Sequence, residues 1–225
     1  FRAINLVITN CSALWGGGVL VSGNSSYLEN VTADNNSARS GGGIHYTNSG
    51  DGYAYDIRVR NNSATNIGGG FYVYGGANPN VIGLHSEGNS ANWGAGVMVY
   101  DASHTMITNA LIIYNTSFDD GDGAGGGAEI WGNSSATFIN STFYGNISEV
   151  GPGSAISSGE NARVSLINSI VWGNQGDPFI DFNLEDSEIN IKNSIIEGGA
   201  DGENVIDADP LFINPSDNNF NVTDG

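Results

Sequence analysis

The fold is decided by residues 36–46, which read Asn-Ser-Ala-Arg-Ser-Gly-Gly-Gly-Ile-His-Tyr. An asparagine, a cluster of three small residues and a short apolar strand follow one another in this order. The same unit recurs along the chain, because glycine-rich clusters begin at residues 16, 41, 68, 94, 125 and 151, in steps of 25, 27, 26, 31 and 26 residues. Self-similarity at a fixed period near 26 residues indicates a repeat architecture.

Asparagines follow the same period in two rows. The first row precedes most of the glycine clusters or continues in phase with them, and it contains Asn36, Asn62, Asn89, Asn115, Asn146 and Asn174, with Cys11 in the equivalent place of the first repeat. The second row lies six residues earlier in most repeats and contains Asn30, Asp56, Gly83, Asn109, Asn140, Asn168 and Asn193. Stacked side-chain amides can hydrogen-bond one another, and Asn tolerates left-handed turn conformations. These rows predict turns that stack from one repeat to the next.

Short strands with alternating apolar residues lie between the turns, for example Val19-Leu20-Val21, Phe71-Tyr72-Val73 and Val97-Met98-Val99. A single repeat cannot bury its apolar face, whereas stacked repeats form a continuous core. We therefore predict an all-β fold, a right-handed parallel β-helix (solenoid) of roughly eight coils of about 26 residues. It forms a single domain over residues 1–225, with an irregular C-terminal segment at 199–225. Because the chain opens in a strand and stops abruptly, we interpret it as a fragment of a longer chain.

Composition narrows the function. The net charge is −18 with six basic residues, which argues against nucleic acid and anionic membranes as partners. No stretch is long and apolar enough to span a membrane. A strongly anionic polysaccharide is also disfavoured unless cations bridge it, and acidic surfaces suit Ca²⁺. Cys11, the single cysteine, is predicted to be a small buried apolar residue.

The units at 35–38 and 41–44, together with Phe138-Ile139-Asn140, resemble the repeats of polymorphic outer-membrane protein adhesins. The segment 168–174 and the later Asp209-Pro210-Leu211-Phe212 resemble bacterial right-handed β-helix surface proteins that carry a C-terminal sorting anchor. Both belong to the pectate-lyase-like superfamily of β-helices. The resemblance implies a β-helix in an extracellular or cell-surface protein, with an adhesive role.

One row of outward positions is aromatic. Tyr72, Tyr74, Tyr100 and Trp131 are predicted to form a contiguous aromatic stripe over three adjacent coils. Aromatic faces with a polar edge suit sugar rings and protein partners. The alternative is that another part of the protein covers the stripe. We hypothesise that it binds a glycan or a surface protein.

Three carboxylates, Asp119, Asp120 and Asp122, lie in the one inserted loop of the repeat. A solvated acidic loop, a Ca²⁺ site and a catalytic pair of carboxylates all remain open for them. No cofactor is otherwise indicated. The histidines at positions 45, 85 and 104 fall at different phases of the repeat, so we expect surface histidines and no shared metal.

The sequence thus favours a non-catalytic, secreted or cell-surface module that binds glycans or partner proteins. One alternative is a polysaccharide lyase or glycoside hydrolase that uses the Asp119–Asp122 loop. Another is a filament subunit that self-associates end to end, because open β-helix ends expose unpaired strand edges.

Overall fold

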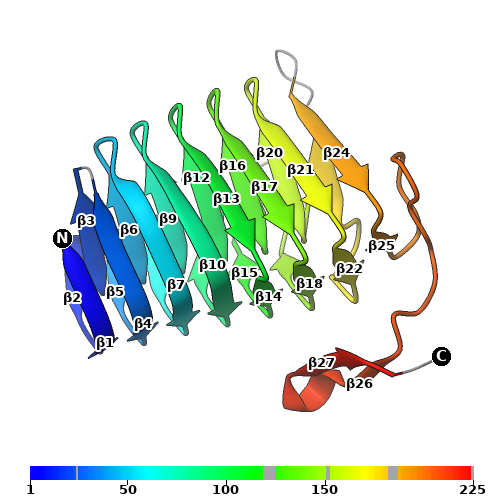
Figure 1. Ribbon diagram of the computed structural model, residues 1–225, viewed down its shortest axis with the longest axis horizontal. Helices are drawn as coiled ribbons and strands as arrows, with labels where there is room; N and C mark the ends of the chain where they lie inside the picture. Colours follow the sequence, from blue (N-terminus) through cyan, green and yellow to red (C-terminus); the bar gives the residue numbers. More distant parts are fainter. Residues whose placement is uncertain (24, 119–124, 151–152, 182–186, 224–225) are drawn as a thin grey trace.

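The computed structural model describes residues 1–23, 25–118, 125–150, 153–181 and 187–223. It is a parallel β-solenoid of about seven turns, in which the strands of successive turns lie side by side (Figure 1). The prediction of an all-β solenoid is confirmed, with one adjustment to the number of coils. Among the described residues one wall has eight rungs, because both the first and the last strand of the solenoid lie in it, whereas another wall has seven strands.

The first wall, sheet A, is the 12-stranded sheet that carries these eight rungs. Its first four rungs are continuous strands, and each later rung is divided in two by a turn at the second asparagine row. The strands are β1 (Arg2–Thr9), β4 (Ser26–Asp34), β7 (Asp51–Arg60), β10 (Asn78–Glu87), β13 (His104–Thr108), β14 (Leu111–Ile113), β17 (Ser135–Ile139), β18 (Thr142–Tyr144), β21 (Arg163–Ile167), β22 (Ile170–Trp172), β24 (Glu188–Lys192) and β25 (Ile195–Ile196).

The strands of the other two walls are shorter, and each turn contributes at most one strand to each of these walls. Sheet B contains β2 (Ser12–Trp15), β5 (Ser37–Ser40), β8 (Ser63–Ile67), β11 (Ser90–Ala91), β15 (Thr116–Ser117) and β19 (Ile147–Ser148). Sheet C contains β3 (Val19–Ser22), β6 (Ile44–Thr47), β9 (Phe71–Tyr74), β12 (Val97–Tyr100), β16 (Ala128–Trp131), β20 (Ile156–Gly159) and β23 (Phe179–Asp181).

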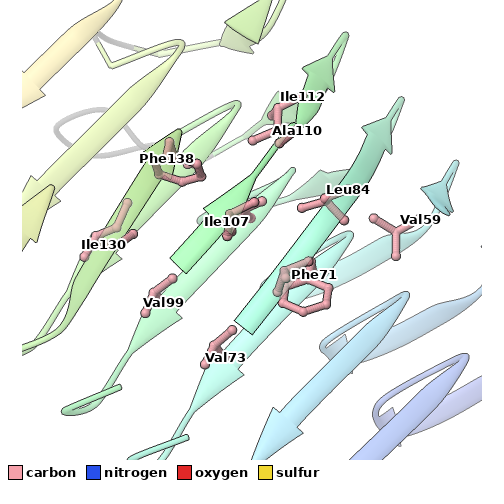
Figure 2. Packing of buried hydrophobic residues seen from close by; sticks show 14 of the residues in the cluster. Val59, Phe71, Val73, Leu84, Val99, Ile107, Ala110, Ile112, Ile130 and Phe138 are labelled. Atoms are coloured by element: carbon pink, nitrogen blue, oxygen red, sulfur yellow. The ribbon is translucent and has the colours of Figure 1, made fainter. Parts of the chain in front are cut away.

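The core lies between the walls and consists of inward rows. Val73, Val99 and Ile130 come from successive strands of sheet C, and Ile107 and Phe138 come from sheet A (Figure 2). All five side chains are fully buried. Parallel pairing in register places the same repeat position above itself in each turn, so the period-2 alternation of each strand becomes a continuous apolar column.

The first asparagine row, Asn36 to Asn174, points into the solenoid and is the inner row. Its side chains form a hydrogen-bonded ladder. The Asn62 amide donates to Oδ1 of Asn89 in the next turn at 3.0 Å and to the backbone carbonyl of Ala33 in the previous turn at 3.0 Å. Its own Oδ1 accepts from the backbone N–H of Asn36 at 3.0 Å. The same pattern runs from Asn36 to Asn174. These hydrogen bonds satisfy turn groups that would otherwise be buried without partners.

Two steric constraints explain why glycine occupies these clusters. In most clusters the first glycine adopts a left-handed conformation, as at Gly41 with φ +69°, which disfavours residues with a Cβ. The second lies against the next turn, so a Cβ on Gly42 would stand 2.5 Å from the Ser63 carbonyl oxygen. In the sixth cluster the residues that pair with the preceding glycines are Gly153, Ser154 and Ala155. The predicted cluster at 151–153 was therefore displaced by two residues, and Ser154 and Ala155 take the places of the second and third glycines.

The two ends of the solenoid differ. At the first turn Val7 and Leu14 are exposed, and so is Cys11, which corrects the prediction that it is buried. Cys11 does occupy the place of the inner asparagine row, since its N–H donates to Asn36 Oδ1. Among the described residues the adjoining strand, β2, is the end strand of sheet B, so Asn36 is the one neighbour of Cys11 in this row. At the opposite end residues 199–206 lie alongside the last rung. Glu203 forms a parallel bridge with Lys192, and Ile206 forms one with Ile195.

The C-terminal segment folds back onto the solenoid. It forms a hairpin of β26 (Phe212–Asn214) and β27 (Asn219–Val222) joined by a 3₁₀ turn at Pro215–Asp217, below the later turns in Figure 1. The rings of Phe212 and Phe220 lie 5.9 and 5.0 Å from that of Tyr144. Tyr114 donates its hydroxyl to the Pro215 carbonyl at 3.0 Å. Tyr114 has a φ of +55°, which is unusual for an aromatic residue. The equivalent position, one residue before the inner asparagine row, holds Asn or Gly in the other turns.

Candidate functional site

An open groove of about 550 Å³ lies where the outer faces of sheets B and C meet, over the first four turns. Strands of sheet B contribute one side, and strands of sheet C, together with Asn48 after β6, contribute the other. The lining residues are Trp15, Leu20, Ser22, Arg39, Ser40, His45, Thr47, Asn48, Asn66, Ile67, Tyr72, Tyr74 and Tyr100. Concave sites with aromatic walls and a few polar groups are the usual form of ligand-binding sites.

A continuous row of rings lies along the sheet C side. His45 stacks on Tyr72 with ring centroids 4.4 Å apart and planes 23° apart. Tyr74 lies 5.7 Å from Tyr72 and 5.9 Å from Tyr100. Parallel register creates the row, because His45 pairs with Tyr72 and Tyr74 pairs with Tyr100. The groove therefore has an aromatic wall that spans three turns.

His45 is buried, and the prediction of a surface histidine was wrong for this residue. It points outward from sheet C, but Gly41 folds back against its Cβ and Tyr72 covers its ring. Neither ring nitrogen has a hydrogen-bond partner, and both are enclosed. Burial lowers the pKa of His45 to about 4, so the imidazole is neutral at physiological pH.

The three tyrosines differ in exposure. Tyr72 is buried, whereas Tyr74 and Tyr100 are half-buried and offer ring surface to the groove. Burial raises the pKa of Tyr72, and the Asp101 carboxylate raises the pKa of Tyr74. Both phenols therefore keep their protons and remain hydrogen-bond donors at physiological pH.

Trp131 does not belong to this groove. It follows Ile130, which pairs with Val99, and so it stands one rung beyond Tyr100. Its ring lies against Gly159 of the following turn. The structure thus brings together Tyr72, Tyr74 and Tyr100 and places Trp131 apart from the groove.

Trp15, Arg39 and His45 are among the lining residues of the groove that sequence reasoning missed. Trp15 and Arg39 belong to sheet B, and their side chains share a groove with sheet C only because the two walls meet at an angle. No local sequence pattern specifies the angle between the two walls. The burial of His45 had one usable signal, since its strand directly follows the glycine cluster 41–43, which can fold against it.

Arg39 is the one charged residue that lines the groove. Its side chain is exposed, and within the described ranges it has no ion pair and no hydrogen bond. The groove thus carries one cation in its lining, although the chain as a whole is strongly acidic.

The other predicted sites lie elsewhere. Asp119, Asp120 and Asp122 lie outside the described residues. Within the part of the chain that the structure describes, no group of three His, Cys, Asp or Glu residues could hold a metal ion. His85 lies on sheet A beside Glu87, and His104 is exposed beside Ser135, so the histidines do not converge. No helix in the described ranges is long and apolar enough to cross a membrane.

Comparisons with known proteins leave the groove as the main guide to function. No protein-family model, no curated protein and no solved structure matches this chain.

Proposed function

We propose that this chain is a non-catalytic binding module that holds sugar rings of a glycan in the groove between sheets B and C. The observation that carries the proposal is the row of tyrosine rings along one side of an open groove. The half-buried rings of Tyr74 and Tyr100 lie 5.9 Å apart, and Trp15 stands on the sheet B side with 54% of its surface exposed.

The physical chemistry of the groove suits a sugar better than a wholly apolar ligand. The C–H face of a pyranose packs on an aromatic ring, and the phenol hydroxyls supply donors and acceptors for the sugar hydroxyls. Ser22, Thr47, Asn48 and Asn66 add further polar groups to the lining. A folded protein partner could use the same rings, and the binding experiment below distinguishes the two.

The parallel ladders support a rigid shaft, because each turn is hydrogen-bonded to the turns on both sides. A rigid acidic shaft with one binding groove fits an adhesive or structural role in a secreted or cell-surface protein. This location is part of the proposal, and it rests on the resemblance of the repeats to surface adhesins.

A glycan microarray followed by titration calorimetry tests the proposal. The wild-type chain is compared with the variants Tyr74→Ala and Tyr53→Ala. Tyr53 is the matched control, since it is a tyrosine on sheet A with 51% of its surface exposed and lies outside the groove. We expect glycan binding that Tyr74→Ala weakens at least ten-fold and that Tyr53→Ala leaves unchanged.

Two outcomes would contradict the proposal. The first is the absence of binding to any glycan, with a purified protein partner captured through Tyr74 instead. The second is glycan binding that survives Tyr74→Ala in a variant whose circular dichroism spectrum is unchanged. Trp131→Ala adds a further control, because the sequence-based stripe includes Trp131 and the groove does not.

A further inference from the structure

Arg39, like Arg58 on sheet A, forms no ion pair with a carboxylate among the described residues. Arg60, Arg163 and Lys192 each form an ion pair with a carboxylate, at 3.2, 3.2 and 3.0 Å. Arg2 lies over the Tyr27 ring, 5.0 Å from its centroid. Arg39 has no such partner among the described residues, although the chain contains 24 acidic residues to its six basic ones. It lines the same groove as the tyrosine row.

We infer that the ligand of the groove is a sugar that carries one carboxylate, with the carboxylate bound by Arg39 while the ring packs against Tyr74 and Tyr100. The inference rests on the proposed function and adds the chemical class of the ligand. A guanidinium presents N–H donors in a planar fork that matches the two oxygens of a carboxylate. An aromatic row and a free arginine in one groove thus complement an apolar ring face and an attached anion.

The charges around the groove limit the ligand to a single carboxylate. Arg39 is the one cation in the lining, and the Asp101 carboxylate stands beside Tyr74 near the other end of the row. A second carboxylate at that end would meet Asp101 without a compensating cation. The net charge of −18 also repels polyanions at long range. These observations favour one terminal acidic sugar over a polyuronate chain.

The test compares each acidic sugar with its own uncharged form. Oligosaccharides that end in glucuronic acid or in N-acetylneuraminic acid are titrated beside their methyl esters, which keep the ring and lose the charge. We expect the acids to bind about ten-fold more tightly than the esters, which corresponds to about 1.4 kcal/mol. The preference should shrink as salt is added, because Arg39 is exposed to solvent.

Substitutions assign the preference to Arg39. Arg39→Gln should abolish the difference between acid and ester and leave ester binding unchanged, whereas Arg39→Lys should retain part of it. Arg163→Gln is the matched control, because it removes the same charge from an exposed arginine on sheet A, remote from the groove.

Each result separates the inference from the proposed function. Equal binding of acid and ester, lost in Tyr74→Ala, overturns the carboxylate inference and leaves the glycan site standing. A preference for the acid that survives Arg39→Gln overturns the assignment to Arg39. Failure of every acid, ester and neutral glycan to bind overturns the proposed function and the inference together.

Discussion

Replacement of Asn89 by alanine tests how much the inner asparagine ladder stabilises the solenoid. The Asn89 amide donates to Asn115 Oδ1 at 3.0 Å and to the Val59 carbonyl at 2.9 Å. Its Oδ1 accepts from both the backbone N–H and the side-chain amide of Asn62, each at 3.0 Å. Asn89 is buried near the middle of the ladder, with neighbours on both sides.

The magnitude follows from the groups that the substitution leaves without partners. In Asn89→Ala, the backbone N–H of Asn62 and one N–H of its side chain both lose their buried acceptor. Each buried, unsatisfied donor costs about 1–3 kcal/mol. We therefore expect the free energy of unfolding to fall by about 4 kcal/mol.

Urea denaturation followed by far-ultraviolet circular dichroism measures this loss. With a slope of about 3 kcal/mol per molar urea, the midpoint should fall by about 1.3 M. Asn168→Gly is the control, because Asn168 belongs to the second asparagine row, which is exposed. Its side-chain amide donates to Asn140 Oδ1 at 2.6 Å. Its φ of +51° is one that glycine also adopts, so the substitution adds no backbone strain. This variant should lose less than about 1 kcal/mol, since water replaces the bond. An equal loss in the two variants would refute the role assigned to the ladder.

Two further predictions concern the glycine clusters and the buried histidine. Gly42→Ala should destabilise the fold by about 2–3 kcal/mol, because its Cβ would stand 2.5 and 2.6 Å from the carbonyl oxygens of Ser63 and Gly69. Gly76→Ala should cost only about 1 kcal/mol of left-handed strain, and equal denaturation midpoints for these two variants would contradict the steric account. His45 has a pKa of about 4 in the folded chain and about 6.5 when unfolded, so the unfolded state binds more protons between these values. The free energy of unfolding of the wild type, compared with that of His45→Phe, should therefore fall as the pH drops from 6.5 to 4. The expected difference is on the order of 3 kcal/mol. Denaturation midpoints of the two proteins that change in parallel over this pH range would count against the prediction.

Much of the fold could be predicted from the sequence because its determinants are local and repeated. Each turn must place an amide beside the next, and Asn36, Asn62 and Asn89 do so at nearly constant spacing. Two of the predictions that were wrong concern positions where the repeat is modified. Cys11 takes the place of an asparagine in the first described turn, and after Val150 the pattern shifts by two residues, to Ser154 and Ala155. The third, the exposure of His45, was wrong within a regular repeat, because Gly41 and Tyr72 pack against its side chain.

The candidate site could be predicted only in part. Tyr72, Tyr74 and Tyr100 belong to one wall and share one register, so their alignment follows from the period. Their degree of exposure does not follow from it, since Tyr72 points outward and is nevertheless covered. Which of them a ligand can reach depends on how the preceding turn folds over each strand.

The repeat pattern alone predicts the parallel solenoid, its period, its inward columns and its ladders, because each of these depends on residues that meet at a fixed separation along the chain. Three features appear only in the folded chain: sheets B and C meet in a groove, Arg39 and Trp15 line it together with the tyrosine row, and His45 is enclosed. The physical reason is that the angle between two walls arises from the packing of the whole turn. Side chains on different walls meet in space without any periodic relation in the sequence.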